Sequence, residues 1–96
     1  MITTHLPKEV RRVIRHHVSI NYSLAKKLVN SLTANSTVIP LKYTPDHEEV
    51  IDVSIKLVKN EVKHYIFVKN GKENIVSRKQ MLDSLATGEY YMMKNN

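Results

Sequence analysis

The chain has 96 residues, a formal net charge of +6 and no cysteine. This length suits a single domain, 1–96, that buries a modest core without disulfide or metal support. The lack of cysteine excludes disulfide frameworks and thiolate chemistry. No apolar run approaches the roughly 20 residues of a membrane span, and the first residues lack the apolar stretch of a secretory signal. We therefore predict a cytoplasmic protein that has no membrane partner.

The positive charge is concentrated at the start of the chain. Residues 1–36 carry six basic side chains against Glu9 alone and so account for +5 of the net charge, whereas residues 37–76 are neutral. A charge asymmetry of this kind predicts an anionic partner.

The first helix is predicted from Pro7 to about His17, because proline suits the first helical position and apolar residues recur at helical spacing. At about 100° per residue, the basic residues of this segment share one arc of the helix, opposite Val10 and Val13. These residues are Lys8, Arg11, Arg12 and Arg15.

A second helix is predicted from Leu24 to Thr33, with Ser23 as its N-cap. Lys26 and Lys27 face away from its apolar arc and extend the set of candidate binding residues. The alternative reading of both helices is an ordinary solvated surface, since Lys and Arg are common on exposed helices. A solvated face usually mixes charge signs, and residues 1–36 do not.

Strands are predicted from residue 37 onward. Thr37 to Tyr43 reads as an edge strand, because Pro40 cannot donate to a hydrogen-bonded ladder. From Val50, β-branched residues alternate with polar ones, which favours a strand. A helix is the alternative there, since Thr44-Pro45-Asp46 resembles a helix start.

Two turns predict an antiparallel meander over residues 50–76. Asn70-Gly71 suits a type I′ turn, whose central residues need positive φ, and it places Ile66 opposite Ile75. Asn60-Glu61, taken as a second two-residue turn, places Ile55 opposite Ile66. Together these turns predict that Ile55, Ile66 and Ile75 share one buried face.

A third helix is predicted from a capping box at Ser77-Arg78-Lys79-Gln80 to about Ala86, with Gly88 as its stop. Glu89 to Met93 forms either a short last strand or a packed tail, and the final Lys-Asn-Asn is expected to fray. The predicted fold is α+β, with element order αα-βββ(β)-α: a basic helical pair (1–36), an antiparallel sheet of three or four strands (37–76) and a C-terminal helix and tail (77–96).

The second face of the sheet is predicted to be apolar at its centre and polar at its rim, as an association surface is. Its apolar residues are Val58, Tyr65, Phe67 and Val76. A two-fold dimer is one interpretation of this face. The other is that the third helix or the tail covers it within one chain.

Metal and catalytic signatures are absent from the sequence. The five histidines lack metal-ligand spacing, although His47 with Glu48 or Asp46 is a conceivable pair, and no cofactor motif occurs. A small metal-independent ribonuclease stays open as an alternative, because several residues could supply a base, a cation and a phenol. These are His64, Arg78, Lys79, Tyr90 and Tyr91.

The leading functional prediction is a non-enzymatic, regulatory or accessory protein that binds DNA or RNA. Its first helix would contact the phosphate backbone, with Lys26 and Lys27 assisting. The main alternative is a protein-binding module or inhibitor whose basic helix docks on an acidic protein surface.

Overall fold

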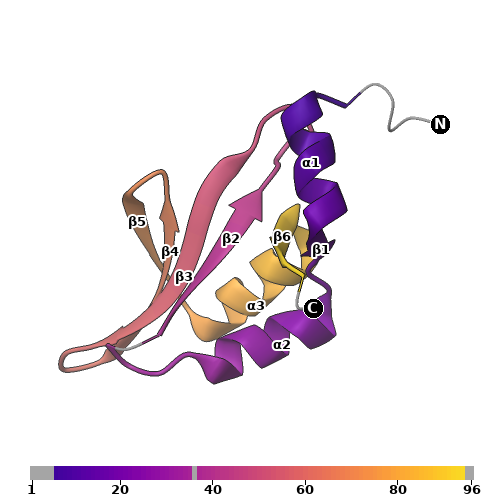
Figure 1. The fold of residues 1–96 in the computed structure, drawn as a ribbon. Helices are drawn as coiled ribbons and strands as arrows, with labels where there is room; N and C mark the ends of the chain where they lie inside the picture. The colour runs from indigo at the N-terminus through magenta and orange to yellow at the C-terminus, as the bar shows by residue number, and fades with distance from the viewer. Residues whose placement is uncertain (1–5, 36, 95–96) are drawn as a thin grey trace.

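A computed structural model describes residues 6–35 and 37–94, and Figure 1 shows their arrangement. The described part of the chain is an α+β fold in which three helices accompany one antiparallel sheet. The elements are α1 (Lys8–His16), β1 (His17–Ser19), α2 (Tyr22–Ser31), β2 (Val38–Tyr43), β3 (Ile51–Lys59), β4 (Lys63–Lys69), β5 (Lys72–Val76), α3 (Arg78–Thr87) and β6 (Tyr90–Met93).

The sheet has six strands in the order β1-β6-β2-β3-β4-β5, and every pairing is antiparallel. Four of these strands, β2 to β5, lie within residues 37–76, where three or four were predicted. The sheet as a whole is larger than predicted, because β1 and β6 add segments from both ends of the chain. The segment from residue 51 is a strand, not the alternative helix, and the last segment, Tyr90–Met93, is a strand, not a packed tail.

The position of β2 also differs from the prediction, since β2 lies between β6 and β3 and is not an edge strand. However, β6 pairs only with Lys42 and Tyr43 of β2. Pro40 lies beyond this short ladder, so its missing N–H leaves no hydrogen bond unmade on that side.

The turn at Asn70-Gly71 is confirmed. Both residues have positive φ, 51° and 80°, and Lys69 pairs with Lys72 across them. The other turn is not of this kind: β3 ends at Lys59 and β4 begins at Lys63, so three residues connect the strands.

The longer turn shifts the register between β3 and β4 by one residue. Ile55 pairs with Phe67, and Leu57 pairs with Tyr65, where Ile66 and His64 were predicted. A one-residue shift moves every side chain of a strand to the other face. The face that holds Ile55 therefore gains two aromatic rings and excludes a histidine, which increases the apolar area it can bury.

Helices α2 and α3 cover the Ile55 face, which we call the inner face (Figure 1). The core beneath them joins residues of both helices to residues of four strands. Its fully buried members include Ala25, Ile55, Met81 and Leu85. Phe67 stacks on Tyr90 there, with ring centroids 5.5 Å apart.

The N-cap of α3 is the one predicted, whereas the N-cap of α2 is a different residue. Ser77 and Gln80 form the predicted capping box of α3. Helix α2 is capped by Asn21, not by Ser23: the Asn21 side chain accepts a hydrogen bond from the Leu24 backbone N–H at 2.8 Å. Gly88 is the C-cap of α3, and a side chain is excluded there because a Cβ would approach the Ser84 carbonyl oxygen and the Tyr90 ring to 2.7 Å.

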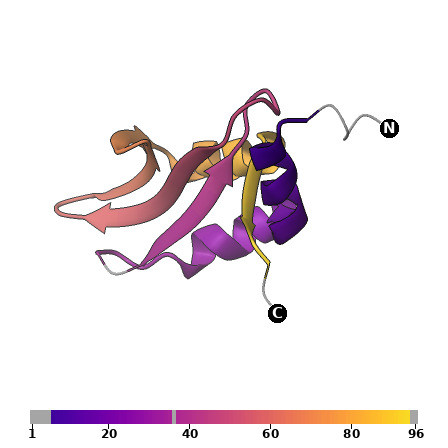
Figure 2. The ribbon, with the colours of Figure 1, turned by 45° about the horizontal axis from the view of Figure 1, so that its top comes forward.

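Helix α1 packs at the other end of the sheet, against β1 and β6 (Figures 1 and 2). Tyr91 pairs with Lys42, whose side chain points away from the inner face, so the Tyr91 side chain does the same. Even so, only 7% of Tyr91 is exposed. Val10 and Val13 of α1 are buried as well. We infer that α1 covers this end of the second face, here called the outer face, and leaves the rest of it open.

Candidate functional site

The four predicted cations of α1 form one exposed row along the helix. Lys8, Arg11, Arg12 and Arg15 are all exposed, while Val10 and Val13 anchor the opposite side of the helix. Within residues 6–35 and 37–94, no carboxylate forms a salt bridge with any of the four. We call this row the basic stripe. Its charges are directed to solvent and are not neutralised by the fold.

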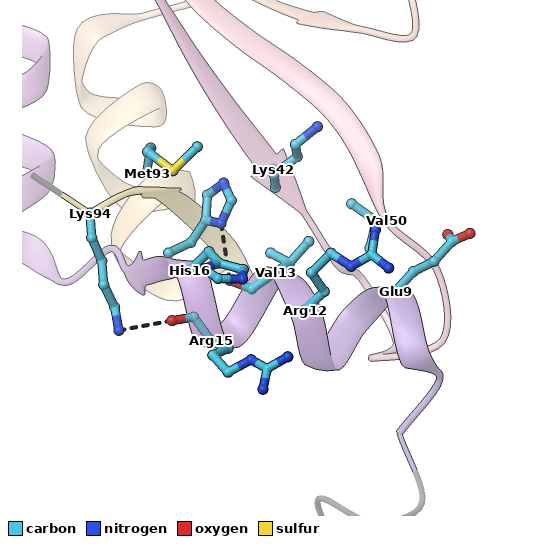
Figure 3. Close-up of a pocket in the computed structure, with 10 residues that line it drawn as sticks. Glu9, Arg12, Val13, Arg15, His16, Lys42, Val50, Met93 and Lys94 are labelled. Carbon is cyan, nitrogen blue, oxygen red and sulfur yellow. Dashed lines mark hydrogen bonds between the residues drawn. The ribbon is translucent and has the colours of Figure 1, made fainter.

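Two depressions flank α1. The one on the side away from the sheet has a volume of about 430 Å³ and is lined mainly by the basic stripe itself, with Leu6 and Ile14. The other, of about 510 Å³, lies between α1 and the outer face of the sheet. Arg12 extends from α1 toward Val50 at this second depression, whereas Arg15 points away from the sheet (Figure 3).

The depression between helix and sheet adds cations that lie outside the basic stripe. The cations are Lys42 and Lys94, and the imidazoles of His16 and His17 line the depression beside them. Lys42 is on β2 and forms a salt bridge with Asp52 on the neighbouring strand β3. Sequence reasoning missed it, because nothing in the local pattern of β2 indicates that α1 packs beside that strand.

Lys94 was predicted to fray, and the structure fixes it instead. Its ammonium donates to the Arg15 carbonyl oxygen at 2.9 Å, and its backbone N–H donates to the His16 carbonyl at 3.2 Å. A cation in this position satisfies the last carbonyls of α1 and complements the helix dipole. Asn95 and Asn96 lie outside the described residues.

His17 is not the last residue of the first helix but the first residue of β1, and it points to the outer face. Its Nδ1 lies 3.0 Å from the Val13 carbonyl oxygen. Burial lowers the pKa of His17, and the positive charges of Lys42 and His16 lower it further, against the opposing effect of the Val13 hydrogen bond. The imidazole therefore favours the neutral form, in which Nδ1–H donates to Val13.

Lys26 and Lys27 are exposed, as predicted, but they belong to a different surface. They lie on α2, which packs with α3 beneath the inner face, whereas the basic stripe stands beside the outer face. Neither lysine lines the two depressions around α1. Lys26 instead lies over the Tyr22 ring, 6.0 Å from its centroid.

The residues of the predicted association surface do not form one exposed face. Phe67 is 3% exposed within the core, and Tyr65 and Val76 pack against the same core. Val58 lies on the outer face, since it alternates with the buried Leu57. The register shift is the reason, and it leaves no exposed Phe67 face for a second copy of the chain.

The residues considered for catalysis are likewise not gathered at one point. Tyr90 and Tyr91 are neighbours in β6, so their side chains lie on opposite faces of the sheet. Arg78 donates to the Asn30 side chain, and Lys79 pairs with Asp83. His47 contacts neither Asp46 nor Glu48 as a partner; its Nε2 lies 3.3 Å from a Glu89 carboxylate oxygen.

Residues 6–35 and 37–94 contain no metal-ligand cluster and no membrane-spanning helix. No group of three or more His, Asp or Glu side chains is placed to hold a metal ion. None of the helices there has the length and apolar content to cross a membrane.

Comparison of the chain with protein-family models, with curated proteins and with solved structures found no significant match. The class that the fold defines is a small α+β domain with one helix-covered sheet face and one open, partly basic face. The basic stripe and the two depressions beside it are the features that bear on function.

Proposed function

We propose that this protein binds nucleic acid through α1, without catalysis, as an accessory or regulatory factor. The observation that carries the proposal is the basic stripe: four exposed cations on one helix face with no salt-bridge partner among the described residues. Four unpaired cations side by side repel each other, which destabilises the helix slightly. A polyanion removes this repulsion, and the counterions it releases supply affinity.

The proposal is tested by replacing Arg11, Arg12 and Arg15 with Ala and measuring binding to DNA and RNA over a range of salt concentrations. The wild-type affinity is expected to fall steeply with salt. The variant is expected to bind more weakly, with a slope of log K against log salt that is smaller by up to about 0.9 per lost phosphate contact on a duplex.

The matched control removes three exposed lysines distant from α1, by replacing Lys59, Lys63 and Lys79 with Ala. It changes the net charge by the same amount, and it is expected to keep most of the affinity. If both triple variants lost the same affinity, binding would depend on net charge alone and not on the basic stripe.

An acidic protein surface is the other partner that the basic stripe would suit. Capture from lysate with and without nuclease treatment separates the two. A partner that is retained after nuclease treatment and lost in the triple arginine variant would replace the nucleic-acid proposal.

A further inference from the structure

The open part of the outer face is hollowed next to the depression that lies between α1 and the sheet. A third depression, of about 540 Å³, runs over β2, β3 and β4 to the Asn70-Gly71 turn. It shares three lining residues with the depression beside α1, namely His17, Lys42 and Met93. The two depressions therefore adjoin at these residues, and together they are here called the outer groove, which extends from α1 across the middle of the sheet.

The outer groove combines a mainly cationic rim with an apolar floor, and the carboxylates of Glu9 and Asp52 also line it. Arg12 and Lys94 stand at its rim, and Lys42 lies at the junction of its two halves. Val50 and Met93 supply the accessible apolar surface of the floor, and the buried Val13 lies beneath it (Figure 3). The rim is held in place by the fold, since Lys94 is bonded to the end of α1 and Lys42 to Asp52.

We propose that the outer groove binds single-stranded nucleic acid, with phosphates at the cationic rim and unstacked bases against the apolar floor. The inference rests on the proposed function and names its preferred form of nucleic acid. A duplex presents charged backbones on its outside and keeps its bases stacked, so it meets the basic stripe but gains nothing from Val50 and Met93. A single strand can turn its bases outward and use both parts of the groove.

Met93 offers a test, because 61% of it is exposed and its replacement leaves the core untouched. Met93→Glu places a negative charge in the outer groove. Val38→Glu is the matched control: Val38 is 58% exposed and lies on the same face, but it borders a separate depression over β2 and β3. The probes are a single strand of about twelve nucleotides, within the roughly 4–16 that such sites cover, and the duplex of the same sequence.

The wild type is expected to bind the single strand more tightly than the duplex. Met93→Glu is expected to weaken single-strand binding at least about fivefold, the effect of one charge about 4 Å from a phosphate when bulk water screens the pair. It should leave duplex binding close to that of Val38→Glu. Met93→Lys reverses the charge at the same position and should strengthen single-strand binding.

The outcomes separate this inference from the function on which it rests. Equal affinity for single strand and duplex, with Met93→Glu and Val38→Glu alike, would overturn the groove and leave the basic stripe as the binding element. Binding of neither form by the wild type would overturn both proposals. Circular dichroism and thermal unfolding of each Met93 variant confirm that any loss is not a loss of folding, and the opposite effects expected of Glu and Lys provide a second safeguard.

Discussion

Ile66 and Ile75 are direct partners on β4 and β5, and yet 5% of Ile66 is exposed against 66% of Ile75. Both point to the outer face, away from the helices. Strand β5 is the edge of the sheet, whereas β4 lies inside it. Ile66 therefore has neighbouring strands on both sides, whereas Ile75 borders solvent on one side. The salt bridge from Lys56 on β3 to Glu73 on β5, 2.7 Å long, must also pass over β4 on this face.

This contrast predicts different costs for the same substitution. Ile66→Lys is expected to lower the free energy of unfolding by several kcal/mol, about the 2–5 kcal/mol of core truncations or more, because a charge would be buried without a partner. Ile75→Lys is expected to change it by less than about 0.5 kcal/mol. Urea unfolding of both variants measures the difference, and equal stabilities would contradict the burial assigned to Ile66.

Lys69 and its cross-strand partner Lys72 are expected to differ in how much the loss of their charge costs in stability. Its ammonium lies 4.5 Å from the ring centroid of Tyr43, 5.4 Å from that of Tyr90 and 5.5 Å from that of Phe67. Lys69→Met keeps most of the apolar stem and removes the charge, so it is expected to cost about 1 kcal/mol of cation–π energy. Its cross-strand partner Lys72 is exposed, and Lys72→Met should be nearly neutral. If chemical denaturation gave Lys69→Met the same free energy of unfolding as the wild type, the contacts of Lys69 with the three rings would contribute nothing to stability.

Tyr90 should make the protein sensitive to alkaline pH. Burial raises the pKa of Tyr90 to about 12, whereas the unfolded chain ionises tyrosine near 10. Between these values the unfolded state has lost the proton and the folded state has kept it. Stability is therefore fully present below about pH 10 and declines as the pH rises toward 12.

Tyr90→Phe tests this dependence, because it keeps the ring that stacks on Tyr43 and Phe67 and removes the ionisable group. Burial also raises the pKa of Tyr91, so Tyr91→Phe is the companion variant. Thermal unfolding between pH 9 and about 12 should show a shallower decline for Tyr90→Phe than for the wild type. Parallel curves would show that Tyr90 does not contribute to the alkaline loss.

Asp52 is expected to oppose ligand binding in the outer groove. It is the carboxylate that pairs with Lys42, and its side chain is 81% exposed. Asp52→Asn should free Lys42 and strengthen single-strand binding several-fold, by about the 1 kcal/mol of one charge interaction in a solvated site. Asp83→Asn is the matched control, since Asp83 also pairs with a lysine, Lys79, but on α3. Equal effects of the two variants would assign the gain to net charge alone.

The local sequence determined most of the elements and the basic stripe. Periodicity located the three helices and the strands over residues 37–76, because the spacing of apolar residues reports which side of an element is buried. Asn70-Gly71 determined its own turn, since few other residue pairs accept positive φ at both positions. The arc of Lys8, Arg11, Arg12 and Arg15 follows from the helical repeat alone.

Only the tertiary structure decided which face each strand presents and what surrounds the stripe. The register of β3 and β4 depends on a turn without a strong local signal, and the burial of Phe67 and Tyr65 beneath α2 and α3 favoured a shift of one residue. Likewise, β1 and β6 are too short to be distinguished from loops until they pair with each other. That pairing brings α1 beside β2 and creates the outer groove, because contacts between distant segments are set by the packing of the whole chain and not by its local preferences.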